Sequence, residues 1–140
     1  NIKKYSRKEI FLEDKELNIN SADEIFLEKL SDYIRDNITD VDLNVNKTSK
    51  ALGMSRVQLY RKVKAITNKS AIHFIRDFRL SIAAKLLEKD TYNINEICYK
   101  VGFQDVSYFR NSFKKKYGIS PKQYAEREQS TIINTSRNEH

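Results

Sequence analysis

The sequence predicts an all-α fold of about seven helices, in which a unit of two helices occurs twice. The 140 residues include only three glycines and one proline, and so few chain-turning residues favour long helices over turn-rich β structure. From residue 22 onward, apolar residues recur at the three- and four-residue spacing of amphipathic helices. Residues 45–70 and 94–120 also match each other position by position, which indicates a duplicated structural unit.

Capping residues and glycines set the ends of the expected helices. Ser21 stands three residues before Glu24, which is the spacing of a capping box at a helix start. Gly53, Gly102 and Gly118 each follow the last apolar position of a helical pattern, where glycine commonly ends a helix. The expected helices span residues 22–38, 45–52, 55–67, 70–89, 93–101 and 105–117, with a last helix from Pro121; Ser55, Ser70, Asp105 and Ser120 stand at the starts of the later ones.

The duplicated unit consists of a short helix, a glycine-containing turn and a longer helix. A shift of 49 aligns Gly53 with Gly102, and one extra residue in the second turn makes the shift 50 from there on. Caps then align with caps and core with core, in the pairs Val45–Ile94, Ser49–Cys98, Leu52–Val101, Ser55–Asp105, Leu59–Phe109, Val63–Phe113, Lys64–Lys114, Ser70–Ser120 and Phe74–Tyr124. This arrangement is the helix-turn-helix plan.

The charge is concentrated in the repeated region. The chain carries a net charge of +7, but residues 45–125 hold 17 Lys and Arg against 5 Asp and Glu, while residues 1–44 and 126–140 are net acidic. A basic block between acidic flanks indicates a polyanionic partner. A lysine-rich surface that is merely solvated is the alternative reading of charge alone.

The second helix of each unit is expected to present one outward face to a groove about 12 Å wide, the major groove of DNA. With Leu59, Val63 and Ile66 turned inward, the outer face of the first such helix consists of Arg56, Val57, Tyr60, Arg61 and Lys64. The equivalent positions of the second are Ser107, Arg110, Asn111 and Lys114, and Lys115 beside them is a further candidate for binding DNA. Arg pairs with guanine, Asn pairs with adenine, and Val contacts the thymine methyl group.

Each of these residues has an ordinary alternative. Arg61 can be a surface arginine, the run from Lys114 to Lys116 can be solvated, and Tyr108 is expected to be a half-buried packing residue.

The helix over 70–89 would be about 30 Å long, close to the spacing of about 34 Å between successive major-groove segments. It is therefore expected to link two subdomains, residues 23–69 and 90–129, with a linker over 1–22 from an upstream part and a polar tail over 130–140.

The sequence resembles the C-terminal DNA-binding domain of AraC/XylS-type transcriptional regulators over about residues 23–126. The resemblance implies a two-lobed fold of seven helices and binding to promoter DNA. It also implies RNA polymerase as a protein partner. It places base-reading positions on Val57, Tyr60, Arg61, Ser107, Arg110 and Asn111, although the second unit often has a basic residue where Asn111 stands. The motifs that carry it are Leu52-Gly53-Met54-Ser55, Leu59-Tyr60-Arg61-Lys62, Phe74-Ile75-Arg76, Asn95-Glu96-Ile97-Cys98, Val101-Gly102-Phe103, Ser107-Tyr108-Phe109, Phe113-Lys114-Lys115, Tyr117-Gly118 and Ser120-Pro121-Lys122-Gln123-Tyr124.

Two further segments, residues 23–27 and 55–62, resemble the output end of hybrid two-component regulators. In such proteins a sensor kinase and a receiver precede this domain on the same polypeptide. The chain does not begin with Met, which agrees with a fragment of such a protein. The resemblance therefore implies upstream receiver and sensor domains, and a parent that would carry the histidine kinase activity.

The sequence favours no enzyme, cofactor or metal site. It lacks a glycine-rich phosphate loop and any nucleophile with a nearby base, and neither His73 nor His140 has partners at ligand spacing. Cys98 is the single cysteine and is expected to be buried; a chain with one thiol, no secretory segment and no membrane span fits the cytoplasm. The remaining alternatives are a basic helical module that binds nucleic acid without sequence preference, or one that binds an acidic protein.

Overall fold

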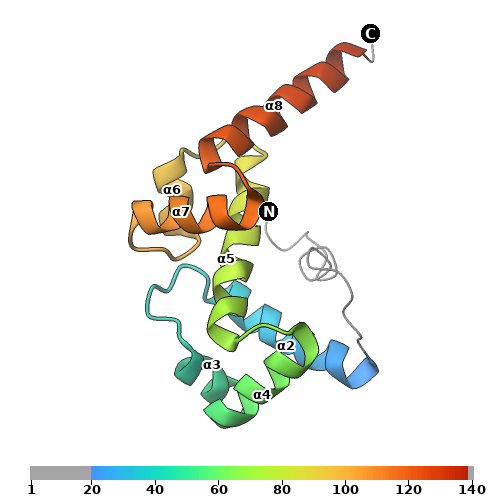
Figure 1. The fold of residues 1–140 in the computed structure, drawn as a ribbon, viewed down its shortest axis with the longest axis vertical. Coiled ribbons are helices and arrows are strands. Elements are labelled where there is room, and N and C mark those ends of the chain that lie inside the picture. Colours follow the sequence, from blue (N-terminus) through green and yellow to red (C-terminus); the bar gives the residue numbers. More distant parts are fainter. Residues whose placement is uncertain (1–19, 139–140) are drawn as a thin grey trace. The chain divides into compact units, whose positions relative to one another are not determined.

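The computed structural model describes residues 20–138, which form seven helices and no strand (Figure 1). The expected all-α class is therefore confirmed for this part of the chain. The expected linker over residues 1–22 lies almost wholly outside the described residues. The helices are α2 (Ser21–Asp36), α3 (Val45–Ala51), α4 (Arg56–Thr67), α5 (Ala71–Leu87), α6 (Ile94–Lys100), α7 (Val106–Tyr117) and α8 (Pro121–Asn138).

The chain divides into two compact units, and the boundary falls inside α5, between Phe78 and Arg79. In the first unit, α3 packs against both α2 and α4. Its core is built from side chains that are almost fully buried, among them Leu27, Leu30, Ile34, Leu59 and Val63. The inward positions expected for α4, including Ile66, are thus confirmed.

The second unit repeats this plan, with α7 packed against both α6 and α8. Ile97, Cys98, Phe109 and Phe113 are fully buried. The Phe113 ring also meets Tyr124 of α8 edge-on, with ring centroids 5.4 Å apart. Burial of the aligned positions in both units confirms that the sequence repeat is a structural repeat.

The turns inside the two units have the same hydrogen bonds. At the end of α3, the amides of Gly53 and Met54 donate to the carbonyls of Lys50 and Ser49. At the end of α6, the amides of Gly102 and Phe103 donate to Tyr99 and Cys98 in the same pattern. Both are Schellman motifs, which need a left-handed residue after the helix, and Gly53 (φ 70°) and Gly102 (φ 89°) supply it.

Side-chain caps begin most of the helices at the expected residues. Ser55 and Gln58 form a reciprocal capping box at the start of α4, and Asp105 accepts from the Tyr108 amide at the start of α7. Ser70 likewise accepts from the amide of His73 at the start of α5. One expected cap was wrong, because the side chain of Asn20, not that of Ser21, accepts from the Asp23 amide at the start of α2.

Three further expectations need correction. The apolar spacing over residues 22–38 includes Ile25, which a core-facing position would bury, but Ile25 is 55% exposed because Phe26, Leu27 and Leu30 form the buried face. The connecting helix α5 has 17 residues and is shorter than the twenty expected. Residues 130–138 of the expected polar tail belong to α8, which ends at Asn138, while the end of that tail lies outside the described residues. Within the described residues, no helix is long and apolar enough to cross a membrane.

Candidate nucleic-acid interface

The outward face of α4 contains the residues predicted from its periodicity. Arg56, Val57, Arg61 and Lys64 are exposed, and Tyr60 is half-buried. Val57 is the most informative of them, because an aliphatic side chain that is 55% exposed contributes nothing to the core. A face that mixes arginines with an exposed aliphatic side chain suits the edges of base pairs, which combine hydrogen-bonding groups with thymine methyls.

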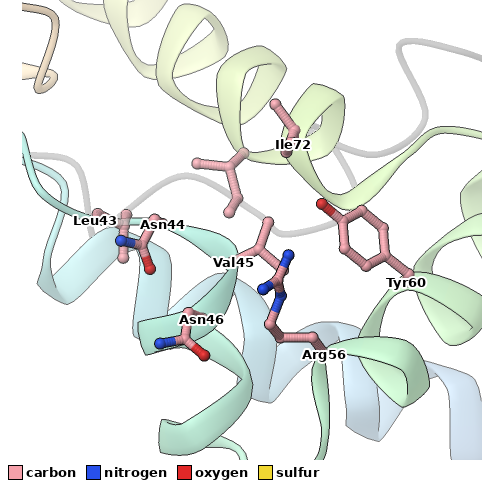
Figure 2. Close-up of a pocket in the computed structure, with 8 residues that line it drawn as sticks. Leu43, Asn44, Val45, Asn46, Arg56, Tyr60 and Ile72 are labelled. Atoms are coloured by element: carbon pink, nitrogen blue, oxygen red, sulfur yellow. The ribbon is translucent and has the colours of Figure 1, made fainter.

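A hollow of about 470 Å³ lies beside the start of α4, within the first unit (Figure 2). Tyr60 of α4 and Ile72 of α5 border one side of it, and the guanidinium of Arg56 extends toward Val45 of α3. Arg56 is therefore exposed and at the same time lines the hollow together with Tyr60. The residues that line the hollow are Leu43, Asn44, Val45, Asn46, Arg56, Tyr60, Ile72 and Ile75.

The outward face of α7 has a different composition. Asn111 lies opposite the buried pair of Phe109 and Phe113 and so marks the centre of the exposed face. The other residues of the face are Ser107, Tyr108, Arg110, Lys114 and Lys115, and all of them are exposed. Tyr108 was expected to be half-buried by packing, but 51% of the residue is exposed. Its ring packs against the ring of Phe103, with the two centroids 5.8 Å apart.

The cations on the two faces are not neutralised within the protein. Among the residues that the structure describes, Arg56, Arg61, Arg110, Lys114 and Lys115 make no ion pair, since the acceptor side chains lie elsewhere. Asp77 of α5, for example, forms its ion pair with Lys69, which lies in the turn that follows α4, at 2.8 Å. A cluster of unneutralised arginines and lysines on a helix surface attracts phosphate groups.

Hydrogen bonds at both ends fix the two helices that carry these faces. α4 begins at the Ser55–Gln58 capping box and ends at Asn68, whose backbone is left-handed with φ 61°. α7 begins at Asp105 and ends at Gly118, which has φ 84°. Asn68 and Gly118 are equivalent in the repeat. In each unit the second helix therefore begins at a side-chain cap and ends at a residue with a left-handed backbone. The outward side chains are therefore held on well-defined helices.

Cys98 lies behind α7, in the core of the second unit, and is fully buried as predicted. Burial raises the pKa of its thiol above the ordinary value of 9.0, the Asp105 carboxylate raises it further, and the Arg110 guanidinium lowers it. The thiol therefore stays protonated near neutral pH and serves as a core side chain. No group of His, Cys, Asp and Glu side chains suited to a metal ion occurs among the described residues.

Comparison with known proteins identifies the class to which this fold and these helices belong. Residues 48–127 match the family model of a helix-turn-helix domain, which is more than half of the chain. The chain belongs to the AraC-type helix-turn-helix family of DNA-binding domains, which occur in transcription regulators. The family resemblance predicted from the sequence is thus confirmed.

Three relatives illustrate the match. The chain is 41% identical over 112 residues to "Histidine kinase P4" of Formosa agariphila, covering 80% of this chain and 8% of that protein. It is 38% identical over 81 residues to the "HTH-type transcriptional regulator MtrA" of Neisseria gonorrhoeae, covering 58% of this chain and 27% of MtrA. The C-terminal domain of AraT, a response regulator from Geobacillus stearothermophilus, superposes with a TM-score of 0.64 at 33% identity and covers 71% and 82% of the two chains.

The chain thus spans only a small part of the curated relatives that it matches, 8% of one and 27% of the other. The similarity to these proteins therefore concerns one segment of each. The likeness to AraT, in contrast, covers most of a domain that was itself solved as a C-terminal fragment of a response regulator.

Proposed function

We propose that this domain binds promoter DNA sequence-specifically, with α4 and α7 as recognition helices in successive major-groove segments. The observation that carries the proposal is the recurrence of one exposed, cationic helix face at equivalent places in both units. A chain with two such helices binds two groove segments without having to dimerise.

Each helix is assigned a distinct readout. On α4, Arg61 donates to guanine, Val57 contacts a thymine methyl group, and Tyr60 bonds a base or a phosphate. On α7, Asn111 pairs with adenine and Arg110 with guanine, while Ser107 bonds a base edge. The remaining cations, Arg56, Lys64, Lys114 and Lys115, bind phosphates and set the register of each helix in its groove.

The proposal extends to the protein of which such a domain would be the output end. The match to a histidine kinase of Formosa agariphila and to the end of a response regulator supports upstream sensor and receiver domains. Promoter binding in turn brings the domain near RNA polymerase, which is the partner through which it would regulate transcription. A cytoplasmic location belongs to the same proposal, because promoter DNA and RNA polymerase are found there.

Selection of bound duplexes from a random DNA pool, near physiological salt, tests the proposal. The expected result is two enriched sequence blocks about one helical turn apart, about 34 Å. Enrichment of no sequence would favour a nonspecific basic module, and no DNA binding at all would favour a protein partner. Either result contradicts the proposal.

Substitutions on the selected operator then assign the two blocks. Arg61→Ala is expected to weaken binding by about 1–3 kcal/mol and to relax one base position in the first block. Arg110→Ala should do the same in the second block. Arg127→Ala is the matched control, because Arg127 is an exposed arginine of α8 outside both faces. Loss of affinity from Arg61→Ala alone would show that only the first unit reads bases.

A further inference from the structure

Tyr108 occupies an unusual place on α7. It is the third residue of the helix, its amide donates to the capping Asp105 at 3.1 Å, and 51% of the residue is exposed. Its ring packs on Phe103, which is buried in the turn before α7. The phenol hydroxyl makes no hydrogen bond to any described part of the protein. The ring is therefore held against Phe103 while about half of the residue stays exposed to solvent.

The helix geometry sets Tyr108 on one flank of the α7 face. Lys115 follows seven residues later, which is nearly two full turns, so the two side chains share that flank. Arg110 lies about 160° away around the helix axis, on the opposite flank, with Asn111 between them. The flank of Tyr108 adjoins the turn between α6 and α7, since Phe103 of that turn holds the ring.

The first unit has no such flank. The position equivalent to Tyr108 is Gln58, whose side chain accepts from the Ser55 amide at 2.9 Å in the capping box. The position equivalent to Lys115 is Ala65, which is exposed but has nothing with which to bind an anion. The two units are therefore alike in fold but differ along this one edge of their recognition helices.

We propose that Tyr108 is a DNA-backbone contact, whose hydroxyl donates to a phosphate oxygen beside the one bound by Lys115. A helix in the major groove has base edges beneath the centre of its face and a phosphate backbone beside each flank. Tyrosine is among the side chains that bind phosphates in this way. The proposal rests on the proposed function, because it requires α7 to lie in the groove.

Tyr108→Phe tests the contact, because it removes the hydroxyl and keeps the ring on Phe103. Affinity is expected to fall about three- to tenfold on the operator and on scrambled DNA alike. The dependence on salt should stay unchanged, since a neutral donor releases no counterions, while Lys115→Ala should reduce the salt slope by about 1. Tyr99→Phe is the matched control, because Tyr99 of α6 is similarly exposed (54%) but lies outside the α7 face.

A methylphosphonate placed at single phosphates of the operator locates the contact. At one position the modified duplex should bind the wild type and Tyr108→Phe equally well, because the acceptor charge is already gone. Unchanged affinity of Tyr108→Phe, or a loss restricted to one base pair, would overturn the assignment. Arg61→Ala and Arg110→Ala keep the two proposals apart: if neither changes DNA binding, the proposed function fails, and if they weaken it while Tyr108→Phe does not, only this inference fails.

Discussion

The guanidinium of Arg79 donates a hydrogen bond of 2.6 Å to the backbone carbonyl of Val101. Arg79 lies on α5 and is only 6% exposed, and Val101 is the C-cap residue that follows α6. Carbonyls at the end of a helix have no partner within that helix. The bond therefore satisfies a buried acceptor and ties the turn before α7 to α5 inside the second unit.

Arg79→Met should destabilise the second unit, because it keeps much of the side-chain bulk but leaves the Val101 carbonyl without its donor. The expected loss is about 1–3 kcal/mol in the free energy of unfolding. Urea denaturation measures the loss, and hydrogen exchange of the α6 and α7 amides localises it. Arg76→Met is the control, since Arg76 is half-buried on the same helix. Equal stability of both variants would mean that the bond contributes nothing net, as can happen when a buried charge is removed with it.

The sequence predicted the helices well because their ends are signalled by local chemistry. Gly53 and Gly102 occupy backbone conformations that other residues rarely adopt, and Ser55 and Asp105 cap where their spacing predicted. The start of α2 was misassigned by one residue because Asn20 and Ser21 are adjacent and both are good caps. Only the actual backbone decides between them.

The details of the surface were harder to predict, because they depend on contacts between segments distant in sequence. Nothing local indicates that Arg79 is buried, since its partner carbonyl lies 22 residues further on. Tyr108 was expected to pack, and its ring does pack on Phe103, but periodicity cannot show that its other half faces solvent. Similarly, periodicity placed Arg56 on the outer face, where it is exposed, but could not show that it also lines a hollow with Ile72 of α5.

Gly118→Ala should destabilise the second unit through backbone strain alone. Gly118 has φ 84°, and an added Cβ would meet no atom within 4 Å, so no clash contributes. A left-handed backbone costs a non-glycine residue about 1–2 kcal/mol, and denaturation with urea should show a loss of that size. Gly118→Asn should lose less, because Asn68 already holds the equivalent left-handed position in the first unit. Equal losses from both variants would contradict this explanation.

Asp105→Asn should lower the pKa of Cys98 and leave the start of α7 intact. Asparagine caps helices as well as aspartate does, so the variant removes mainly the carboxylate that raises the thiol pKa. Thiolate absorbance during an alkaline titration measures the change. In the wild type, the raised pKa gives a stability contribution that is complete below about the ordinary value of 9.0 and is lost as the pH rises further. That alkaline loss should be smaller in Asp105→Asn, and a larger one would show that the sign is wrong.

Ala65→Lys gives α4 a lysine at the position that Lys115 occupies on α7. Ala65 is exposed on α4 and equivalent to Lys115, so a lysine there should reach the DNA backbone if α4 lies in its groove as α7 is proposed to do. DNA affinity should then rise, and the slope of its logarithm against that of salt concentration should steepen by about 0.9. Ala22→Lys is the control, since it adds the same charge to an exposed alanine of α2 and leaves the α4 face unchanged. If the two variants gain equally, the effect comes from net charge, and the flank of α4 does not follow the DNA backbone.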